Sequence, residues 1–162
     1  MVTKKTKQLG PNQLEQKILR TIFDIKSTNI NLIAKTTGIA KSTIHNRMKR
    51  MRSSELLKGI MPLLDLKYIQ KQITAVSLIK ARYGPEYAEE IGKKIANIVG
   101  IWAVYFVLGS NDFILLIRAK DKEELEHILN EITKTEGVER SETIMVIKLL
   151  KEDFSESLKL IV

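Results

Sequence analysis

Residues 29–51, NINLIAKTTGIAKSTIHNRMKRM, decide the fold of the N-terminal part of the chain. Asn29 can cap a short helix, and Gly38 stands where that helix should end, because glycine readily adopts the left-handed conformation of a helix C-terminus. After this turn, apolar residues recur at i, i+4 and i+7 from Ile44 to Met51, which predicts a helix with one buried and one free face. Two helices joined by such a glycine turn are the layout of a DNA-binding helix-turn-helix.

Another helix is expected just before this motif. Pro11 and Asn12 open it, and Asn12 with Glu15 has the spacing of a capping box, in which each residue satisfies a backbone N–H group of the other. Apolar residues follow with helical periodicity from Leu14 to Ile25. The N-terminal part therefore contains three short helices.

Basic residues are concentrated in the same part of the chain. Residues 1–60 contain 13 lysines and arginines and 3 acidic residues, a formal charge of +10, whereas residues 61–162 contain 14 and 16, a charge of −2. Such segregation is typical of a polyanion-binding segment joined to a near-neutral domain. A basic surface that only confers solubility is the alternative at this level.

Composition excludes several classes of protein. Of the 162 residues, 44% are hydrophobic, enough for one ordinary core or two small ones. Cysteine is absent, which excludes disulfides, thiolate zinc sites and a cysteine nucleophile. The longest apolar stretch, Ile98 to Gly109, is too short to span a bilayer, and the first ten residues lack the apolar run of a signal peptide. We expect a cytoplasmic protein without membrane association.

The C-terminal part alternates strands and helices. A glycine-containing turn at 109–112, a capping pair formed by Asp121 and Glu124, and Pro85, which suits the first turn of a helix, separate its apolar segments. The predicted elements are strands at 73–81, 101–108, 113–119 and 138–150, one helix carrying Ala88 to Ile98, and one helix ended by Gly137. This βαββαβ order is the split-βαβ pattern of ferredoxin-like domains.

One of these strands predicts an assembly. Residues from Trp102 to Leu108 are apolar at successive rather than alternate positions, so both faces of the strand should be buried. Helices would cover one face of such a sheet, and a second copy of the chain is the simplest cover for the other. We therefore expect a homodimer.

The fold class is α+β, with two domains. Gly59 and Pro62 interrupt regular helix where the composition changes, and they mark the boundary between the domains. The expected segments are a basic arm at 1–10, a helix-turn-helix domain at 11–60, a connector strand or linker at 61–72, the βαββαβ domain at 73–151 and a C-terminal tail at 152–162.

Across nearly its whole length the sequence resembles the Lrp/AsnC family of feast-famine regulators, in its archaeal type. The matching residues are Ile33-Ala34, Gly38-Ile39, Ile44, Arg47, Met51, Gly59, Leu64-Asp65, Gly109, Asp112, Gly137-Val138, Ser141 and Thr143. The resemblance implies a winged helix-turn-helix domain followed by a ferredoxin-like domain of the RAM type. It also implies a dimer formed through the sheet, assembly into tetramers or octamers, and amino-acid effectors bound between dimers.

Three positions depart from the family pattern. Ala40 stands where the family usually has a serine that caps the third helix, so capping should shift to Ser42 or be lost. Glu55 replaces a usual glycine at the end of that helix, which suggests a different turn into the wing. Asn111 stands where an aromatic residue is frequent, so the identity of the effector does not transfer from the family.

The free face of the third helix is the candidate DNA-binding surface. A rotation of 100° per residue places Ser42, Asn46 and Lys49 opposite the apolar face, where they would enter the major groove. Asparagine can pair with adenine and lysine with guanine, whereas serine discriminates little. Flanking, phosphate-binding or ion-pairing positions are Lys41, Thr43, His45, Arg47, Arg50 and Arg52. A merely solvated polar face is the alternative.

The resemblance places effector binding at the turn from Gly109 to Asp112. The Asp112 carboxylate would accept the ammonium of an amino acid, and the N–H groups around Ser110 and Asn111 would receive its carboxylate. Two hydroxyl groups two residues apart in the last predicted strand lie on the same face of the sheet and would complete a polar pocket. They belong to Ser141 and Thr143. The alternative is that this turn and these hydroxyls are only structural, as both are common structural devices.

The predicted function is sequence-specific transcription regulation by a DNA-binding protein that responds to an amino acid or related metabolite. Its expected partners are approximately palindromic duplex DNA and further copies of the chain. The alternatives are a ligand-independent architectural or autoregulatory DNA-binding protein, and a small-molecule binding module with a vestigial helix-turn-helix. No cofactor or metal is expected, and catalysis has no support, because His45 and His127 lie in different domains and no metal-ligand or nucleotide-binding motif is present.

Overall fold

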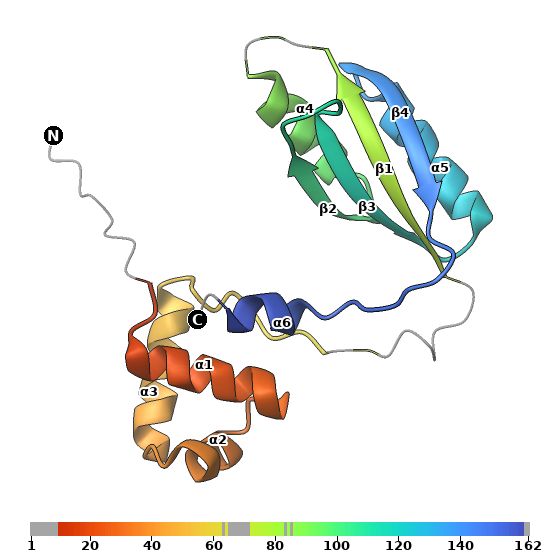
Figure 1. Cartoon of the computed structure of the whole chain (residues 1–162). Helices are drawn as coiled ribbons and strands as arrows, with labels where there is room; N and C mark the ends of the chain where they lie inside the picture. Colours follow the sequence, from red (N-terminus) through yellow and green to blue (C-terminus); the bar gives the residue numbers. More distant parts are fainter. Residues whose placement is uncertain (1–9, 63, 65–71, 83, 85, 161–162) are drawn as a thin grey trace, which may run out of the picture. The chain divides into compact units, whose positions relative to one another are not determined.

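The computed structural model describes residues 10–62, 64, 72–82, 84 and 86–160 (Figure 1). Within these residues the chain forms six helices and four strands. The elements are α1 (Gln13–Ile25), α2 (Ile30–Thr37), α3 (Lys41–Ser53), β1 (Ile73–Ala81), α4 (Tyr87–Ala96), β2 (Ile101–Phe106), β3 (Phe113–Ala119), α5 (Lys122–Lys134), β4 (Val138–Met145) and α6 (Phe154–Lys159). One unit contains α1, α2, α3 and α6, and the other contains the strands with α4 and α5. Within the described residues, no helix has the length and apolar character needed to cross a membrane.

The caps predicted from the sequence set the ends of the first two helices. Asn12 Oδ1 accepts the N–H of Glu15 at 3.0 Å and Glu15 Oε2 accepts the N–H of Asn12 at 3.1 Å, which confirms the capping box of α1. The side chain of Asn29 accepts hydrogen bonds from two N–H groups at the start of α2. Gly38 ends α2 with a φ of 73°, a conformation that favours glycine.

These helices pack around a small apolar core. Its buried members are Ile18, Leu19, Ile33, Ile44, Met48 and Met51. The predicted inner face of α3 is therefore confirmed, and the polar residues of α3 are left on the opposite side.

The two ends of α3 show the effects of the departures from the family pattern. Ala40 is the N-cap residue, and because its methyl group cannot accept a hydrogen bond, side-chain capping is lost at this position. Glu55 adopts the left-handed conformation, with a φ of 60°, where the family usually has glycine. No strand follows α3 in residues 54–62 and 64, and the expected wing and connector over 61–72 lie mostly outside the described residues.

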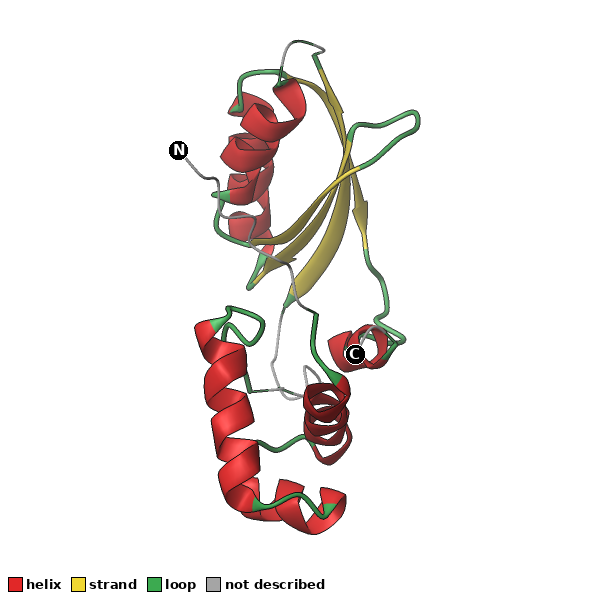
Figure 2. Cartoon of the chain, turned by 90° about the vertical axis from the view of Figure 1, so that its left-hand side faces the viewer, coloured by secondary structure: helices red, strands yellow, loops and turns green. Residues whose placement is uncertain are grey.

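The four strands form an antiparallel sheet in the order β2-β3-β1-β4, which confirms the ferredoxin-like prediction. Figure 2 shows α4 and α5 together on one side of this sheet. Strands β1 and β3 have the predicted bounds. Pro85, expected in the first turn of α4, lies outside the described residues, and the helix itself begins at Tyr87.

Two strands end earlier than predicted. β2 stops at Phe106 rather than at residue 108, because the N–H of Val107 already donates to the C=O of Asp112 and closes the hairpin. β4 stops at Met145 rather than at residue 150. It runs antiparallel to β1, and Met145 already pairs with Ala75 close to the first residue of β1, so the strand soon loses its partner.

Side chains alternate between the face covered by the helices and an open face. The covered face holds the core, formed by Ala75, Ile79, Ala81, Ile91, Ile95, Ile101, Phe113, Leu115, Ile117, Ala119, Leu125, Ile128 and Ile132. Gly137 precedes β4 with a φ of 94°, three residues after α5 ends. The left-handed conformation favours glycine here, and a Cβ would lie 2.5 Å from Ile91 Cδ1 of α4, so a larger residue would also displace that side chain.

Residues 152–162, expected as a tail, contain α6. Asp153 caps this helix, because its Oδ1 accepts the N–H of Ser155 at 2.9 Å and the hydroxyl of Ser155 at 2.6 Å. Lys159 Nζ lies 3.1 Å from Asp24 Oδ1 of α1. The chain segment after the sheet therefore belongs to the helical unit. The sequence did not predict α6, because six residues are too few to show a helical period.

Candidate DNA-binding face and effector turn

Helix α3 exposes the polar face that its periodicity predicts. Ser42, Asn46 and Lys49 are exposed, on the side opposite the buried Ile44 and Met48. Other exposed candidates are Lys41, His45, Arg50 and Arg52, and the half-buried ones are Thr43 and Arg47. Amide, ammonium and hydroxyl groups that can bind base edges therefore share one helix face.

A buried carboxylate lies beside this face. Glu15 of α1 is 4% exposed, and its Oε1 lies 3.6 Å from Arg47 Nη1 and 3.6 Å from Arg50 Nε. From the sequence, we predicted only one role for Glu15, as a member of the capping box. Its second role depends on the packing of α1 against α3, and the sequence carries no signal for it beyond the small number of acidic residues in residues 1–60.

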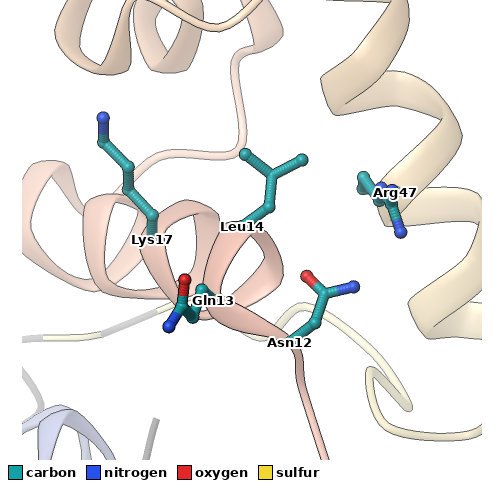
Figure 3. A pocket seen from close by; sticks show the side chains of 5 residues that line it. All are labelled: Asn12, Gln13, Leu14, Lys17 and Arg47. Atoms are coloured by element: carbon teal, nitrogen blue, oxygen red, sulfur yellow. The ribbon is translucent and has the colours of Figure 1, made fainter.

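An open groove lies at the start of α1 (Figure 3). Its lining residues are Asn12, Gln13, Leu14, Lys17 and Arg47. Two of these are cations, from α1 and α3, and Lys17 Nζ also donates to the C=O of Thr37 at 3.1 Å. A cationic groove beside the free face of α3 is suited to a phosphate group.

The turn between β2 and β3 combines exposed and buried residues. Its exposed or half-buried residues are Gly109, Ser110 and Asn111. Asp112 is 3% exposed, and its Oδ2 accepts the N–H of Ala81 at 2.8 Å and lies 3.3 Å from Lys80 Nζ. The carboxylate thus connects the turn to the end of β1 through a hydrogen bond and an ion pair. This is the structural role that we predicted from the sequence as the alternative to ligand binding.

The two strand hydroxyls lie on the covered face of β4, as their common facing predicts. Thr143 Oγ1 is hydrogen-bonded to Ser77 Oγ of β1. Ser141 pairs with Ile79, and the C=O of Ile79 accepts the N–H of Asp112 at 2.8 Å. Ser141 and the turn therefore flank the same residue of β1, whereas Thr143 lies farther along β4 and bonds to Ser77.

The open face of the sheet carries apolar side chains on all four strands, although Glu142 of β4 is the neighbour of Leu78 on this face. Register places Tyr105, Ile114 and Leu78 in one row, because Ile114 pairs with both of the others. Leu116 and Val76 pair in the next row, which Ile144 continues on β4. Tyr105 is 52% exposed and Ile144 50% exposed, so α4 and α5, which lie on the other side of the sheet, leave this face uncovered.

Residues 74–156 match the model of the Lrp/AsnC ligand binding domain. The chain is also 33% identical over 141 residues to the HTH-type transcriptional regulator FL11 of Pyrococcus furiosus, which covers 87% of this chain and 92% of the relative. The chain belongs to the Lrp/AsnC family. FL11 of Pyrococcus horikoshii is 31% identical over 141 residues, which are 87% of this chain and 92% of that relative.

Solved structures of the family share the fold. AsnC of Escherichia coli has a TM-score of 0.73 at 17% identity, over 90% of this chain and 97% of that chain. A transcriptional regulator of Neisseria meningitidis, NMB0573, solved in complex with L-Met, has a TM-score of 0.77 at 16% identity, over 93% and 99%.

The Lrp/AsnC relatives are transcription regulators rather than enzymes, in agreement with the prediction that the chain is not an enzyme. Among the residues that the structure describes, no group of three or more His, Cys, Asp and Glu side chains is placed to hold a metal ion.

Proposed function

We propose that the protein is a sequence-specific DNA-binding transcription regulator whose DNA binding or oligomeric state responds to an amino acid or a related metabolite. The exposed polar face of α3 carries this proposal, because it presents base-reading groups within the segment of charge +10. The proposed location of this DNA-binding regulator is the cytoplasm.

In this proposal α3 is the recognition helix. Asn46 and Lys49 read base edges in the major groove, and Ser42 supports them near the start of the helix. The basic and polar flanks hold the DNA backbone and fix the register of the helix. They comprise Lys41, Thr43, His45, Arg47 and Arg50.

The DNA is expected to be approximately palindromic, because a dimer presents two recognition helices. The open apolar face of the sheet supports a homodimer, since a second copy would cover Tyr105 and Ile144. Two helix-turn-helix motifs related by symmetry read half-sites about one helical turn apart or a multiple of it. Further assembly to tetramers or octamers follows the resemblance to the family.

The effector is proposed to bind at the turn between β2 and β3, with an amino acid as the ligand class. Two structural neighbours were solved with methionine, the Neisseria meningitidis regulator and a feast or famine regulatory protein of Mycobacterium tuberculosis. Exposed Ser110 and half-buried Asn111 would bind the ligand carboxylate through their N–H groups. Asp112 would take the ammonium and share its carboxylate with Ala81 and Lys80. Gly109, Ser141 and Thr143 complete the proposed set.

A ligand-independent architectural or autoregulatory DNA-binding protein is the second candidate. The buried state of Asp112 favours it, because a carboxylate already bound to Ala81 and Lys80 needs no ligand for its stability.

The deciding experiment is selection of bound duplexes from a random DNA pool, with and without a mixture of amino acids, followed by calorimetry with single amino acids. Enrichment of a palindromic sequence that the mixture changes supports the first function. Enrichment that no amino acid changes, with no calorimetric heat, supports the second. Binding that hardly varies with salt, or no enrichment at all, contradicts sequence-specific regulation through the basic segment.

A further inference from the structure

Glu15 is a buried acid within the basic unit of the chain. Its Oε2 accepts the N–H of Asn12 at the start of α1. Its Oε1 accepts no hydrogen bond within the described residues and lies 3.6 Å from a nitrogen of Arg47 and 3.6 Å from a nitrogen of Arg50. One carboxylate therefore serves the cap of α1 and also faces two arginines of α3.

This arrangement restrains both arginines. A buried carboxylate is strongly destabilised without a cation beside it, so the two guanidinium groups are held at its side. Both remain accessible, because the side chain of Arg47 is 33% exposed and that of Arg50 is 56% exposed. Arg47 also lines the groove at the start of α1, where Figure 3 places it across from Asn12 and Leu14.

We propose that Glu15 is a positioning residue for DNA binding: it holds Arg47 and Arg50 in the orientation in which they contact backbone phosphates when α3 lies in the major groove. The inference rests on the proposed DNA-binding function. A side chain that is ordered before binding loses less conformational entropy in the complex. The restrained arginines also fix the register of α3, on which base reading by Asn46 depends.

The charge of Glu15 has a second effect, opposite in sign. A carboxylate beside two arginines weakens their attraction for any polyanion, whatever its sequence. Glu15 thus lowers sequence-independent binding while it supports binding to the correct sequence. A purely structural residue behaves differently, because its loss weakens binding to every duplex.

The test compares Glu15→Gln with Asp24→Asn in the full-length protein. Glutamine keeps an oxygen acceptor for the N–H of Asn12, removes the charge and places an amide NH2 group beside the arginines. Asp24→Asn removes one negative charge from the same unit at an exposed residue, whose ion pair is with Lys159 of α6. Affinities are measured for the duplex selected from the random pool and for a scrambled duplex of equal length, over a series of salt concentrations.

Glu15→Gln should bind the scrambled duplex about three-fold more tightly, with a steeper salt dependence, and should lose about ten-fold in discrimination between the two duplexes. Asp24→Asn should keep the discrimination of the wild type. Unchanged discrimination in Glu15→Gln, or equal weakening on both duplexes, would overturn the proposal.

A second measurement separates this inference from the proposed function. The guanidinium Nε–H signals of Arg47 and Arg50 in nuclear magnetic resonance spectra of the DNA-free protein should show restricted motion in the wild type and free rotation in Glu15→Gln. Free rotation in both proteins would overturn the positioning role. A wild type that binds no duplex but shows restrained arginines would refute the DNA-binding function and leave Glu15 as a structural anchor, which also ends the proposal.

Discussion

Asn46 is the side chain of α3 best suited to read a base, because an exposed amide offers adenine both a donor and an acceptor. Asn46→Ala should cost about 1–3 kcal/mol at one base pair of each half-site and should leave binding to unrelated duplexes nearly unchanged. Competition binding against single-position variants of the selected duplex measures this. Asn130→Ala, an exposed asparagine in α5, is the matched control. Equal losses on all duplexes would assign Asn46 to the backbone instead.

Asp112 has a structural role in the turn and is also the proposed acceptor of the effector ammonium. Asp112→Ala leaves the buried N–H of Ala81 without its acceptor and should lower the free energy of unfolding by about 1–3 kcal/mol. Asp112→Asn keeps an oxygen for that N–H and should melt closer to the wild type. If the carboxylate binds an amino acid, calorimetry with L-methionine should show loss of binding in Asp112→Asn despite its retained stability. Wild-type affinity in this variant would exclude Asp112 from the effector site.

The residues of α3 show what the sequence predicts and what it does not. Helical periodicity alone predicted that Asn46 is exposed and that Ile44 is buried, because both follow from the geometry of a single helix. The contacts of Glu15 with the arginines and the bond from Ala81 to Asp112 join different elements. Such contacts depend on packing and register, which the spacing of residues along the chain does not encode.

At the scale of elements, α6 is the feature that the sequence did not predict. Hydrogen bonds from the side chain and then the backbone of Ser155 hold the pKa of Asp153 below its ordinary value. A depressed pKa means that the capping carboxylate stabilises α6 above the unfolded pKa, which is about 4, and that this contribution is lost as the pH falls through the lower folded value. As the pH falls below about 4, the signals of α6 should therefore shift with the protonation of Asp153 in a titration followed by nuclear magnetic resonance.

The matched variant for this titration is Asp153→Asn. Asparagine caps a helix nearly as well as aspartate but does not titrate, so α6 should keep its structure and lose this acid transition. An unchanged transition in this variant would assign the pH dependence to a group other than Asp153.

The ends of helices and strands were predicted closely where capping residues or turns mark them in the sequence. They were not where a neighbouring strand determines the length of the element. The caps at Asn12 and Asn29 set the starts of α1 and α2, and apolar segments bounded by turns gave β1 and β3 their ends. β2 and β4 are the edge strands of the sheet, and their lengths depend on where a single partner strand ends. That information lies in the pairing of strands rather than in either strand's own residues.

For the whole molecule, the open face of the sheet leads to the last prediction. Tyr105 is 52% exposed there, in register with Ile114. A glutamate at this position would face the apolar surface of the partner chain, where burying an unpaired charge is strongly unfavourable, but it would stay hydrated in a monomer. Tyr105→Glu should therefore lower the mass measured by light scattering at micromolar concentration while the sheet domain stays folded by circular dichroism.

Val99→Glu is the control for this variant, because it places the same charge on an apolar residue that is 86% exposed between α4 and β2, outside the sheet. Its mass should equal that of the wild type. The affinity for DNA should change together with the measured mass. A chain released from the dimer presents one recognition helix, so Tyr105→Glu should bind a single half-site about as well as the wild type. It should lose the added affinity for the complete palindrome. A folded wild-type monomer, or a Tyr105→Glu variant of unchanged mass, would place the dimer interface elsewhere on the chain.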